Sequence, residues 1–458
     1  MTSSDSTSDN ARSDLSSMLR HAGSVLVGQL AVMAFSITDT IVAGRFSSGA
    51  LAALSVASAI YISAYVSLIG VLQSLLPVYA ELHGARRYPE LGRNFRQSFC
   101  LAFILALLGM SVMLWPKGFL QWGQVPLELI SEITHYLAIL AWTLPATLGF
   151  RMYSALNQGL GKPLFVTWLQ IGALAVKVPL TIWLAFGGAG VSAMGLAGCA
   201  WASFIVSWLI LACAIVMMRT QTLYHPLQLW TRFEAPDWPL LKQFTRTGLP
   251  GGLAYLVEIT SFTLMALFVA RLGVDSAAGH QIAANMTGTL YMLPLSLSIA
   301  CSARVSFWMG ASQLTRANRV ARLGLLCALM QASLTASLLY TFAHPIAALY
   351  SSNPAVITMG AQLLAWVALY HVADALQSIS AFVLRCYRVT LTPLAIYGVL
   401  LWGFGLYGGY LLAYEGVLGI PAMLHAQAFW VAGTVALAAV ALIFLLILIR
   451  LTTIQPVP

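Results

Sequence analysis

The chain has 458 residues, of which 60% are hydrophobic and only 8% are charged, and its mean hydropathy is +0.84. Because a soluble domain is about 25% charged, this composition excludes an ordinary soluble fold. The formal net charge of +9 does not indicate nucleic-acid binding, since no soluble basic domain is present to contact phosphates and membrane proteins collect Lys and Arg in cytoplasmic loops.

The amino-terminal segment, residues 1–21, is polar and rich in Ser and Asp. It lacks the short apolar core and the small-residue cleavage site of a secretory signal peptide. We therefore expect residues 1–21 to form a disordered tail that stays in the cytoplasm.

Apolar runs long enough to cross about 30 Å of hydrocarbon as a helix recur along the rest of the chain. Bounded by charges, Pro and Gly, these runs predict about twelve transmembrane helices. The predicted helices are 22–44, 50–79, 95–116, 128–154, 163–186, 193–218, 246–271, 276–304, 321–343, 354–384, 391–414 and 420–450. The expected fold is an all-α integral membrane protein.

The longest polar interval separates six predicted helices from the other six. The resulting domains are an N-lobe over 22–218, a cytoplasmic linker over 219–245, a C-lobe over 246–450 and a cytoplasmic tail over 451–458.

Two short matches indicate that the C-lobe repeats the N-lobe in the same direction. Ile41–Arg45 and Phe268–Leu272 end the first helix of each half. Gly161–Pro163 and Leu391–Pro393 precede the fifth helix of each half, and the two matches have nearly the same separation along the chain. Since internal repeats are common in transporters, we expect two pseudo-symmetric six-helix bundles.

Lys and Arg are distributed very unequally between the two sides of the predicted membrane protein. With both termini in the cytoplasm, nineteen of the 23 cations face the cytoplasm, Arg151 and Arg385 among them. The outer side has only Arg45, Lys117 and Arg271, and Lys177 lies within a span. This excess predicts a multi-pass protein of the bacterial inner membrane with both termini inside.

Three acidic residues, Asp39, Glu258 and Asp374, lie well inside predicted spans, as does Lys177. A charge at mid-membrane costs about 2.5 to 3.5 kcal/mol and usually marks an ion or substrate pathway. In the C-lobe, Glu258 and Asp374 bring two negative charges into one bundle, a pattern that favours a metal cation or a shared proton. In the N-lobe, Lys177 is expected to offset Asp39.

Aromatic and amide side chains are predicted near the two C-lobe acids. Tyr370 lies one helical turn before Asp374, and Tyr255 and Phe262 flank Glu258 at helical spacing. Aromatic faces beside a carboxylate suit an organic cation or a metal ion, although packing alone also explains such a pattern. Asn285 is a candidate neutral ligand, with hydrogen bonding between helices as the alternative.

Five stretches together resemble the MATE (multidrug and toxic compound extrusion) family, and within it the NorM-like bacterial branch. They are TDTIVAG at 38–44, SALNQGLGKP at 154–163, GHQIAAN at 279–285, DALQ at 374–377 and LRCYR at 384–388. The resemblance covers roughly residues 20–450.

This resemblance implies a V-shaped pair of bundles that export cationic or amphiphilic organic compounds against inward Na⁺ or H⁺, by alternating access and without a cofactor. It implies cation coupling at Glu258, Asp374 and Asp39, with Glu258 and Asp374 as the metal ligands if the ion is Na⁺, and with Tyr370 as their aromatic neighbour. Relatives commonly have Asn or Asp before the Pro of the fifth helix, where this chain has Lys177. Because of this departure, the resemblance does not carry a proton or sodium site over to the first lobe. Lys177 is either a fixed counter-ion of Asp39 or a buried lysine that itself titrates.

Several alternatives and exclusions accompany this interpretation. A dedicated exporter of an endogenous metabolite such as a siderophore fits equally well, whereas a lipid-linked oligosaccharide flippase of the same superfamily is expected to have about fourteen helices. An enzyme is not expected, because the eight His residues are dispersed without a catalytic spacing. The six Cys residues form no C-x-x-C pair, so free thiols are expected. The expected partners are small-molecule substrates and membrane lipids, with no nucleic acid, for a monomeric protein.

Overall fold

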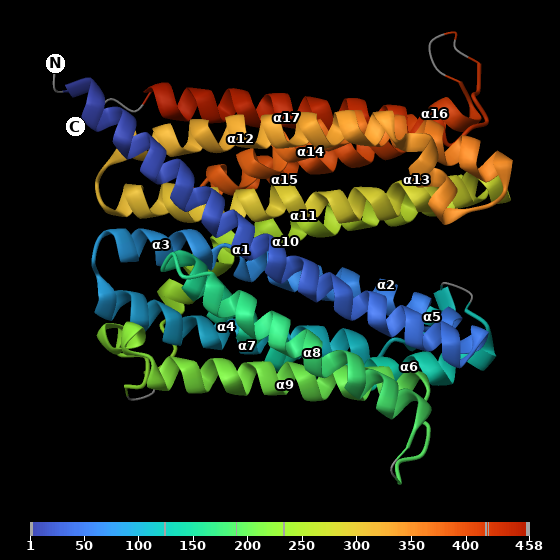
Figure 1. Ribbon diagram of the computed structural model, residues 1–458, viewed down its shortest axis with the longest axis horizontal. Helices are drawn as coiled ribbons and strands as arrows, with labels where there is room; N and C mark the ends of the chain where they lie inside the picture. Colours follow the sequence, from blue (N-terminus) through green and yellow to red (C-terminus); the bar gives the residue numbers. More distant parts are fainter. Residues whose placement is uncertain are drawn as a thin grey trace. The chain divides into compact units, whose positions relative to one another are not determined.

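The computed structural model describes residues 3–122, 125–188, 190–231, 234–416, 419 and 421–454 (Figure 1). These described residues form helices and connecting segments, and they contain no β-strand. Eleven of the described helices are long and apolar enough to cross a membrane, and the count is twelve when a helix pair bent by 45° between Ala141 and Leu144 is taken as one span. Helices dominate because the membrane interior offers no water to satisfy backbone groups.

The first half of the chain forms nine α-helices and one short 3₁₀ helix. They are α1 (Ser3–Phe46), α2 (Ser48–Leu72), α3 (Leu75–Gly84), α4 (Tyr88–Leu114), α5 (Lys117–Trp122), α6 (Leu127–Ala141), α7 (Leu144–Gly159), α8 (Leu164–Phe186), α9 (Leu196–Thr220) and η1 (Thr222–Leu227).

The second half forms eight α-helices and a π-helical segment. They are α10 (Trp238–Ala270), α11 (Val274–Gly310), α12 (Leu314–Thr341), α13 (Ala343–Tyr350), α14 (Pro354–Cys386), α15 (Leu391–Tyr397), η2 (Gly398–Tyr407), α16 (Gly408–Tyr414) and α17 (Gln427–Ile454). Six of these twelve spans precede α10, and the other six are the α10 span and the five that follow it.

The positions at which the spans begin confirm that the second half of the chain repeats the first half in the same direction. At the fifth spans they give a different alignment from the predicted one. The second spans begin at positions 48 and 274, the third at 88 and 314 and the fourth at 128 and 354, so the separation is the same in all three cases. The fifth spans begin at positions 164 and 391, a separation only one position longer. The predicted alignment of Pro163 with Pro393 was wrong, because Pro163 precedes α8 whereas Pro393 is the third residue of α15.

The chain divides into two compact units, and the division lies inside helices rather than in the polar interval. The first unit is Ser24–Gly252, and the second unit joins Met1–Gly23 to Leu253–Pro458. The polar interval 219–245 therefore groups with the first bundle, where Arg93 and Arg96 of α4 pair with Asp237 and Glu234. Helix α10 also begins at Trp238, ahead of the predicted start at 246.

Residues 3–21 of the segment that was expected to be disordered lie in helix α1, and residues 1 and 2 lie outside the described residues. Asp14 is only 1% exposed and accepts hydrogen bonds from Arg304 Nη2 at 2.7 Å and from Arg316 Nε at 2.7 Å. Trp308 Nε1 donates to the same carboxylate at 3.2 Å. A charge-assisted network of this kind orders the segment despite its polar composition.

Replacing Asp14 with Asn should loosen the start of α1, because two arginines lose their shared carboxylate and a charged hydrogen bond contributes about 1.5 to 3 kcal/mol. Amide hydrogen exchange over residues 12–23 should become at least several times faster, while exchange within α17 stays unchanged. The exposed Asp275 provides the matched control, Asp275→Asn. Equal exchange in the wild type and in Asp14→Asn would show that the network does not anchor this segment.

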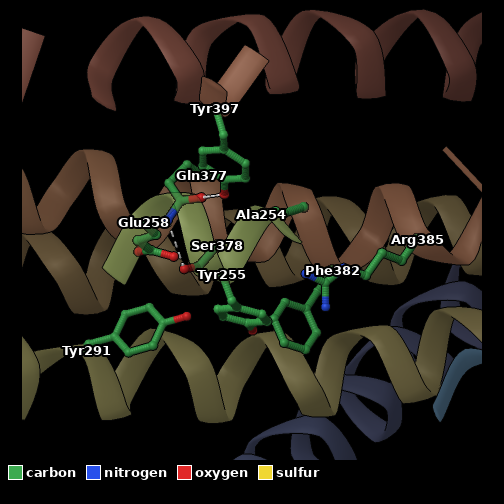
Figure 2. Close-up of a pocket in the computed structure, with 10 residues that line it drawn as sticks. Ala254, Tyr255, Glu258, Tyr291, Gln377, Ser378, Phe382, Arg385 and Tyr397 are labelled. Atoms are coloured by element: carbon green, nitrogen blue, oxygen red, sulfur yellow. Dashed lines mark hydrogen bonds between the residues drawn. The ribbon is translucent and has the colours of Figure 1, made fainter. Parts of the chain in front are cut away.

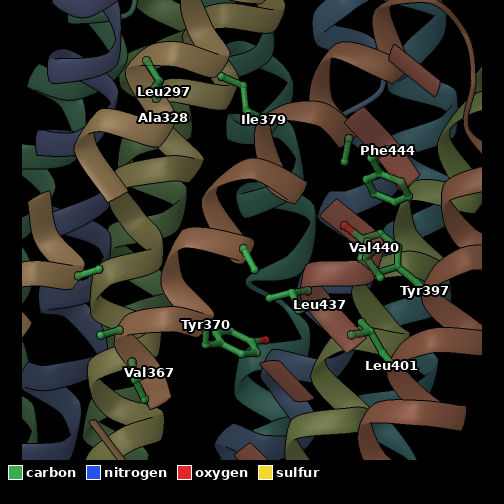
Figure 3. Packing of buried hydrophobic residues seen from close by; sticks show 14 of the residues in the cluster. Leu297, Ala328, Val367, Tyr370, Ile379, Tyr397, Leu401, Leu437, Val440 and Phe444 are labelled. Carbon is green, nitrogen blue, oxygen red and sulfur yellow. The ribbon is translucent and has the colours of Figure 1, made fainter. Parts of the chain in front are cut away.

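Helix α14 is the central helix of the second unit. It packs against α11, α12, α13 and α17, and its residues Val367, Tyr370 and Ile379 belong to the same buried cluster as Leu437 and other residues of α17 (Figure 3). A polar side chain in the middle of α14 is therefore held within an apolar core.

Candidate functional site

A small cavity in the second unit brings together polar residues from four helices (Figure 2). Helix α10 contributes Tyr255 and Glu258, α11 contributes Tyr291, α14 contributes Gln377, Ser378 and Arg385, and α15 contributes Tyr397. The α14 residues follow Asp374 by three, four and eleven positions, a spacing that places them on one helical face.

Asp374 lies at the buried end of a short hydrogen-bond chain. It is 2% exposed, and its Oδ1 accepts a hydrogen bond of 2.9 Å from Gln377 Nε2. The Tyr397 hydroxyl donates to Gln377 Oε1, which turns the amide nitrogen of Gln377 toward the acid. Gln377 is thus a positioned donor, and Tyr397 fixes its orientation.

Glu258 is half-buried and has a different environment. Among the described residues, no side chain forms a hydrogen bond or ion pair with its carboxylate. Asp374 and Arg385 are near enough for their charges to act on it. Glu258 and Asp374 thus belong to one charged group, and Arg385 adds a positive charge that leaves one net negative charge when both acids are ionised.

Arg385 lies against aromatic faces and has a spare donor. Its guanidinium carbon is 5.5 Å from the Tyr255 ring centroid and 4.8 Å from that of Phe382, distances typical of cation–π contacts. Its Nη1 atom is buried without a hydrogen-bond partner. The prediction that Arg385 simply faces the cytoplasm missed this position beside Glu258.

A second cavity extends from Glu258 along an aromatic cluster. Phe262, Tyr370 and Trp430 line it, and their ring centroids are 5.8 to 6.3 Å apart in edge-to-face pairs. Tyr370 and Phe262 line this cavity together with Glu258, and Trp430, which the sequence analysis did not name, lines it as well. Both cavities share Glu258, so this carboxylate faces a polar and an aromatic environment.

The first unit contains the predicted ion pair between Asp39 and Lys177. Lys177 Nζ lies 2.8 Å from Asp39 Oδ1 and 3.1 Å from Oδ2, and it also donates to Ser203 Oγ at 2.6 Å and to the Cys199 carbonyl at 3.3 Å. Lys177 is 1% exposed and Asp39 is 8% exposed. The pairing is confirmed, and the ammonium occupies the position beside Asp39 that a bound cation would need.

Comparison with known proteins identifies the family of this chain. The model of the MatE family matches residues 25–183 and 250–411. The chain belongs to the MatE family.

Two bacterial relatives of this MatE protein match nearly its whole length. It is 35% identical over 427 residues to the probable multidrug resistance protein NorM of Aromatoleum aromaticum, over 93% of this chain and 92% of that protein. It is 33% identical over 434 residues to the multidrug resistance protein MdtK of Yersinia pseudotuberculosis, over 94% of each. These matches confirm the resemblance to the NorM-like branch and indicate a multi-pass protein of the bacterial inner membrane.

A solved structure shares the fold of this MatE protein. The Vibrio cholerae MATE transporter VcmN in the bent form is similar with a TM-score of 0.85 and 17% identity, over 97% of this chain and 98% of that one. The all-α fold predicted from the sequence is therefore confirmed.

One predicted site residue of this MatE protein lies elsewhere. Asn285 is exposed and accepts a hydrogen bond of 3.1 Å from Gln281 Nε2, and it lines neither cavity. Tyr291, further along the same helix, lines the cavity instead. The step from Asn285 to Tyr291 corresponds to about 600° of helical rotation, so the two side chains project from different faces of α11.

Proposed function

We propose that this MatE protein exports cationic and amphiphilic organic compounds from the cell in exchange for inward movement of H⁺ or Na⁺. The observation that carries the proposal is Glu258, a membrane-embedded carboxylate that has no hydrogen-bond partner among the described residues and that lies beside Asp374. Intramembrane acids commonly mark ion pathways. The relatives named multidrug resistance proteins support the substrate class.

The coupling follows from charge repulsion in the second unit. When both acids are ionised, Glu258 and Asp374 repel each other, and Arg385 offsets only part of their charge. A proton or a sodium ion on the carboxylates relieves the repulsion, and carboxylate oxygens are suitable ligands for a hard cation. A bound ion changes the relative stability of two conformations only if it binds one of them better, which is the requirement for coupled exchange.

The aromatic cavity gives the organic substrate a neighbouring surface. The rings of Phe262, Tyr370 and Trp430 adjoin Glu258, and an aromatic face next to a negative charge attracts an organic cation. An ion and a cationic substrate would therefore compete for the same charge. Tyr255, against which Arg385 packs, is proposed to keep this arginine beside the acids.

In the first unit we propose a different role for the charged pair. Lys177 acts as a fixed counter-ion to Asp39, so Asp39 supports the bundle rather than exchanging an ion. The excess of cations on one side supports a cytoplasmic location for both termini. We expect the protein to act as a monomer and to perform no catalysis.

Expression in a pump-deficient bacterium should lower the cellular accumulation of ethidium severalfold, because the protein couples dye export to an ion gradient. The proton gradient and the sodium gradient are then collapsed in separate experiments. Ethidium accumulation should return to the level of cells without the protein when the gradient of the coupling ion is lost. The measurement is dye fluorescence per cell at equal expression. Efflux that persists after both gradients are collapsed would contradict the proposed coupling.

A further inference from the structure

A polar cavity in the first unit is separate from the Asp39 and Lys177 pair. Helices α1, α7 and α8 surround it, and its polar lining is Gln29, Arg151, Ser154, Gln158, Thr167 and Gln170. Apart from the half-buried Arg151, all of these side chains are buried. No carboxylate lines the cavity.

Arg151 has an unused donor in this cavity. Its Nε atom is buried without a hydrogen-bond partner, and no ion pair to Arg151 exists within the described residues. An arginine that only supports packing normally has its donors satisfied. The guanidinium therefore brings an uncompensated positive charge into the bundle.

The neighbouring polar groups leave further donors available. Gln158 Nε2 donates to Ser154 Oγ at 3.0 Å, and Thr167 Oγ1 donates to the Ser24 carbonyl at 2.7 Å. In the described part of the chain, the side-chain amides of Gln29 and Gln170 form no hydrogen bond. Two neutral amides and a guanidinium can together donate to one anionic group.

The internal repeat places this cavity at the position equivalent to the Glu258 cavity. When the fourth spans are aligned at their starts, positions 128 and 354, Arg151 corresponds to Gln377. The same separation pairs Gln29 with Tyr255, and alignment of the fifth spans at positions 164 and 391 pairs Gln170 with Tyr397. All three counterparts line the second-unit cavity.

The two equivalent cavities differ in charge. The cavity of the second unit contains Glu258, with Asp374 nearby, whereas the cavity of the first unit contains Arg151 without an acid. The same position in the fold thus presents a net negative charge in one bundle and a positive charge in the other. Ligands of opposite charge are expected at the two positions.

We propose that the first-unit cavity binds a small anionic group through the guanidinium of Arg151 and the side-chain amides of Gln29 and Gln170. A planar guanidinium binds a carboxylate in two parallel hydrogen bonds. The group is the carboxylate of a zwitterionic organic substrate or a small inorganic anion such as chloride. The first possibility, a substrate carboxylate, rests on the proposed function.

The test uses full-length protein purified into proteoliposomes and two fluorescent probes. Rhodamine B has a cationic ring system and a free carboxylate, and its ethyl ester has the same ring system without the acid. Arg151→Gln introduces the residue that the repeat has at the equivalent position, so the backbone and the helix are expected to accept it. Arg151→Gln should lose about tenfold more transport of rhodamine B than of the ester, and Arg151→Lys should lie between this variant and the wild type.

A second variant and a second condition separate the outcomes. Gln29→Leu removes an amide without changing the charge, and it should weaken rhodamine B binding more than ester binding in a fluorescence polarisation titration. Replacing potassium chloride with potassium isethionate tests the inorganic source. If this replacement changes ester transport by the wild type but not by Arg151→Gln, chloride is the occupant.

The proposal is overturned if Arg151→Gln impairs both probes equally, or neither, and the change of anion has no effect. Failure of the proposed function gives a different result. Glu258→Gln should stop the transport of both probes, and continued ion-dependent transport by that variant would contradict the coupling role of Glu258 whatever Arg151 binds.

Discussion

Glu258→Gln and Asp374→Asn are each expected to abolish ion-coupled efflux while the amount of protein in the membrane stays close to that of the wild type. Each substitution keeps the size and hydrogen-bonding capacity of the side chain and removes only its charge. Asn at position 374 still accepts the hydrogen bond that Gln377 donates, so the local packing is retained. Either substitution removes the repulsion between the two carboxylates, and this repulsion is what favours binding of a cation or a proton.

The measurement is the initial rate of ethidium efflux from loaded cells after an imposed proton or sodium gradient. The rate for either variant should fall at least tenfold, to the level of cells without the protein. Glu415→Gln is the matched control, because Glu415 is an exposed acid after α16 in the same unit, and its rate should not change.

Efflux at the wild-type rate and with the wild-type ion dependence in both variants would refute the role of these acids. The carboxylates would then be structural. If a variant loses both efflux and membrane expression, thermal unfolding of the purified variant distinguishes misfolding from loss of coupling. Only a variant that is folded and inactive supports the coupling role.

Asp39→Asn is expected to destabilise the protein rather than to remove coupling selectively. The substitution leaves the ammonium of Lys177, which is 1% exposed, without its negative partner. Breaking a buried ion pair by removing one member costs roughly 3 to 5 kcal/mol. The remaining hydrogen bonds to Ser203 and Cys199 do not neutralise the charge.

A double-mutant cycle measures this effect. Lys177→Met alone should be destabilising because it leaves Asp39 unpaired, whereas Asp39→Asn combined with Lys177→Met should recover much of the loss. The midpoint of thermal unfolding in detergent is the readout, with dye efflux measured at equal membrane expression. Normal stability of Asp39→Asn together with complete loss of efflux would instead identify Asp39 as an ion-exchanging residue.

The membrane class, the helical spans and the intramembrane acids could all be predicted from the amino-acid sequence. Hydrocarbon thickness sets the length of a span, and the absence of water forces the backbone into helices. These constraints act locally, so they can be read from apolar runs. The pairing of Asp39 with Lys177 was also predictable, because each charge is costly alone within the membrane.

Which faces of the helices contact one another could not be predicted from the sequence. Arg385 could have been associated with Asp374 from their separation of about three helical turns, but its position beside Glu258 depends on how α10 packs near α14. The same applies to Asn285, which lines neither cavity of the second unit, and to Asp14, which pairs with arginines of α11 and α12. Periodicity indicates which residues share one face of a helix. The rotation and the axial position of that helix relative to its neighbours come from packing between residues far apart in the chain.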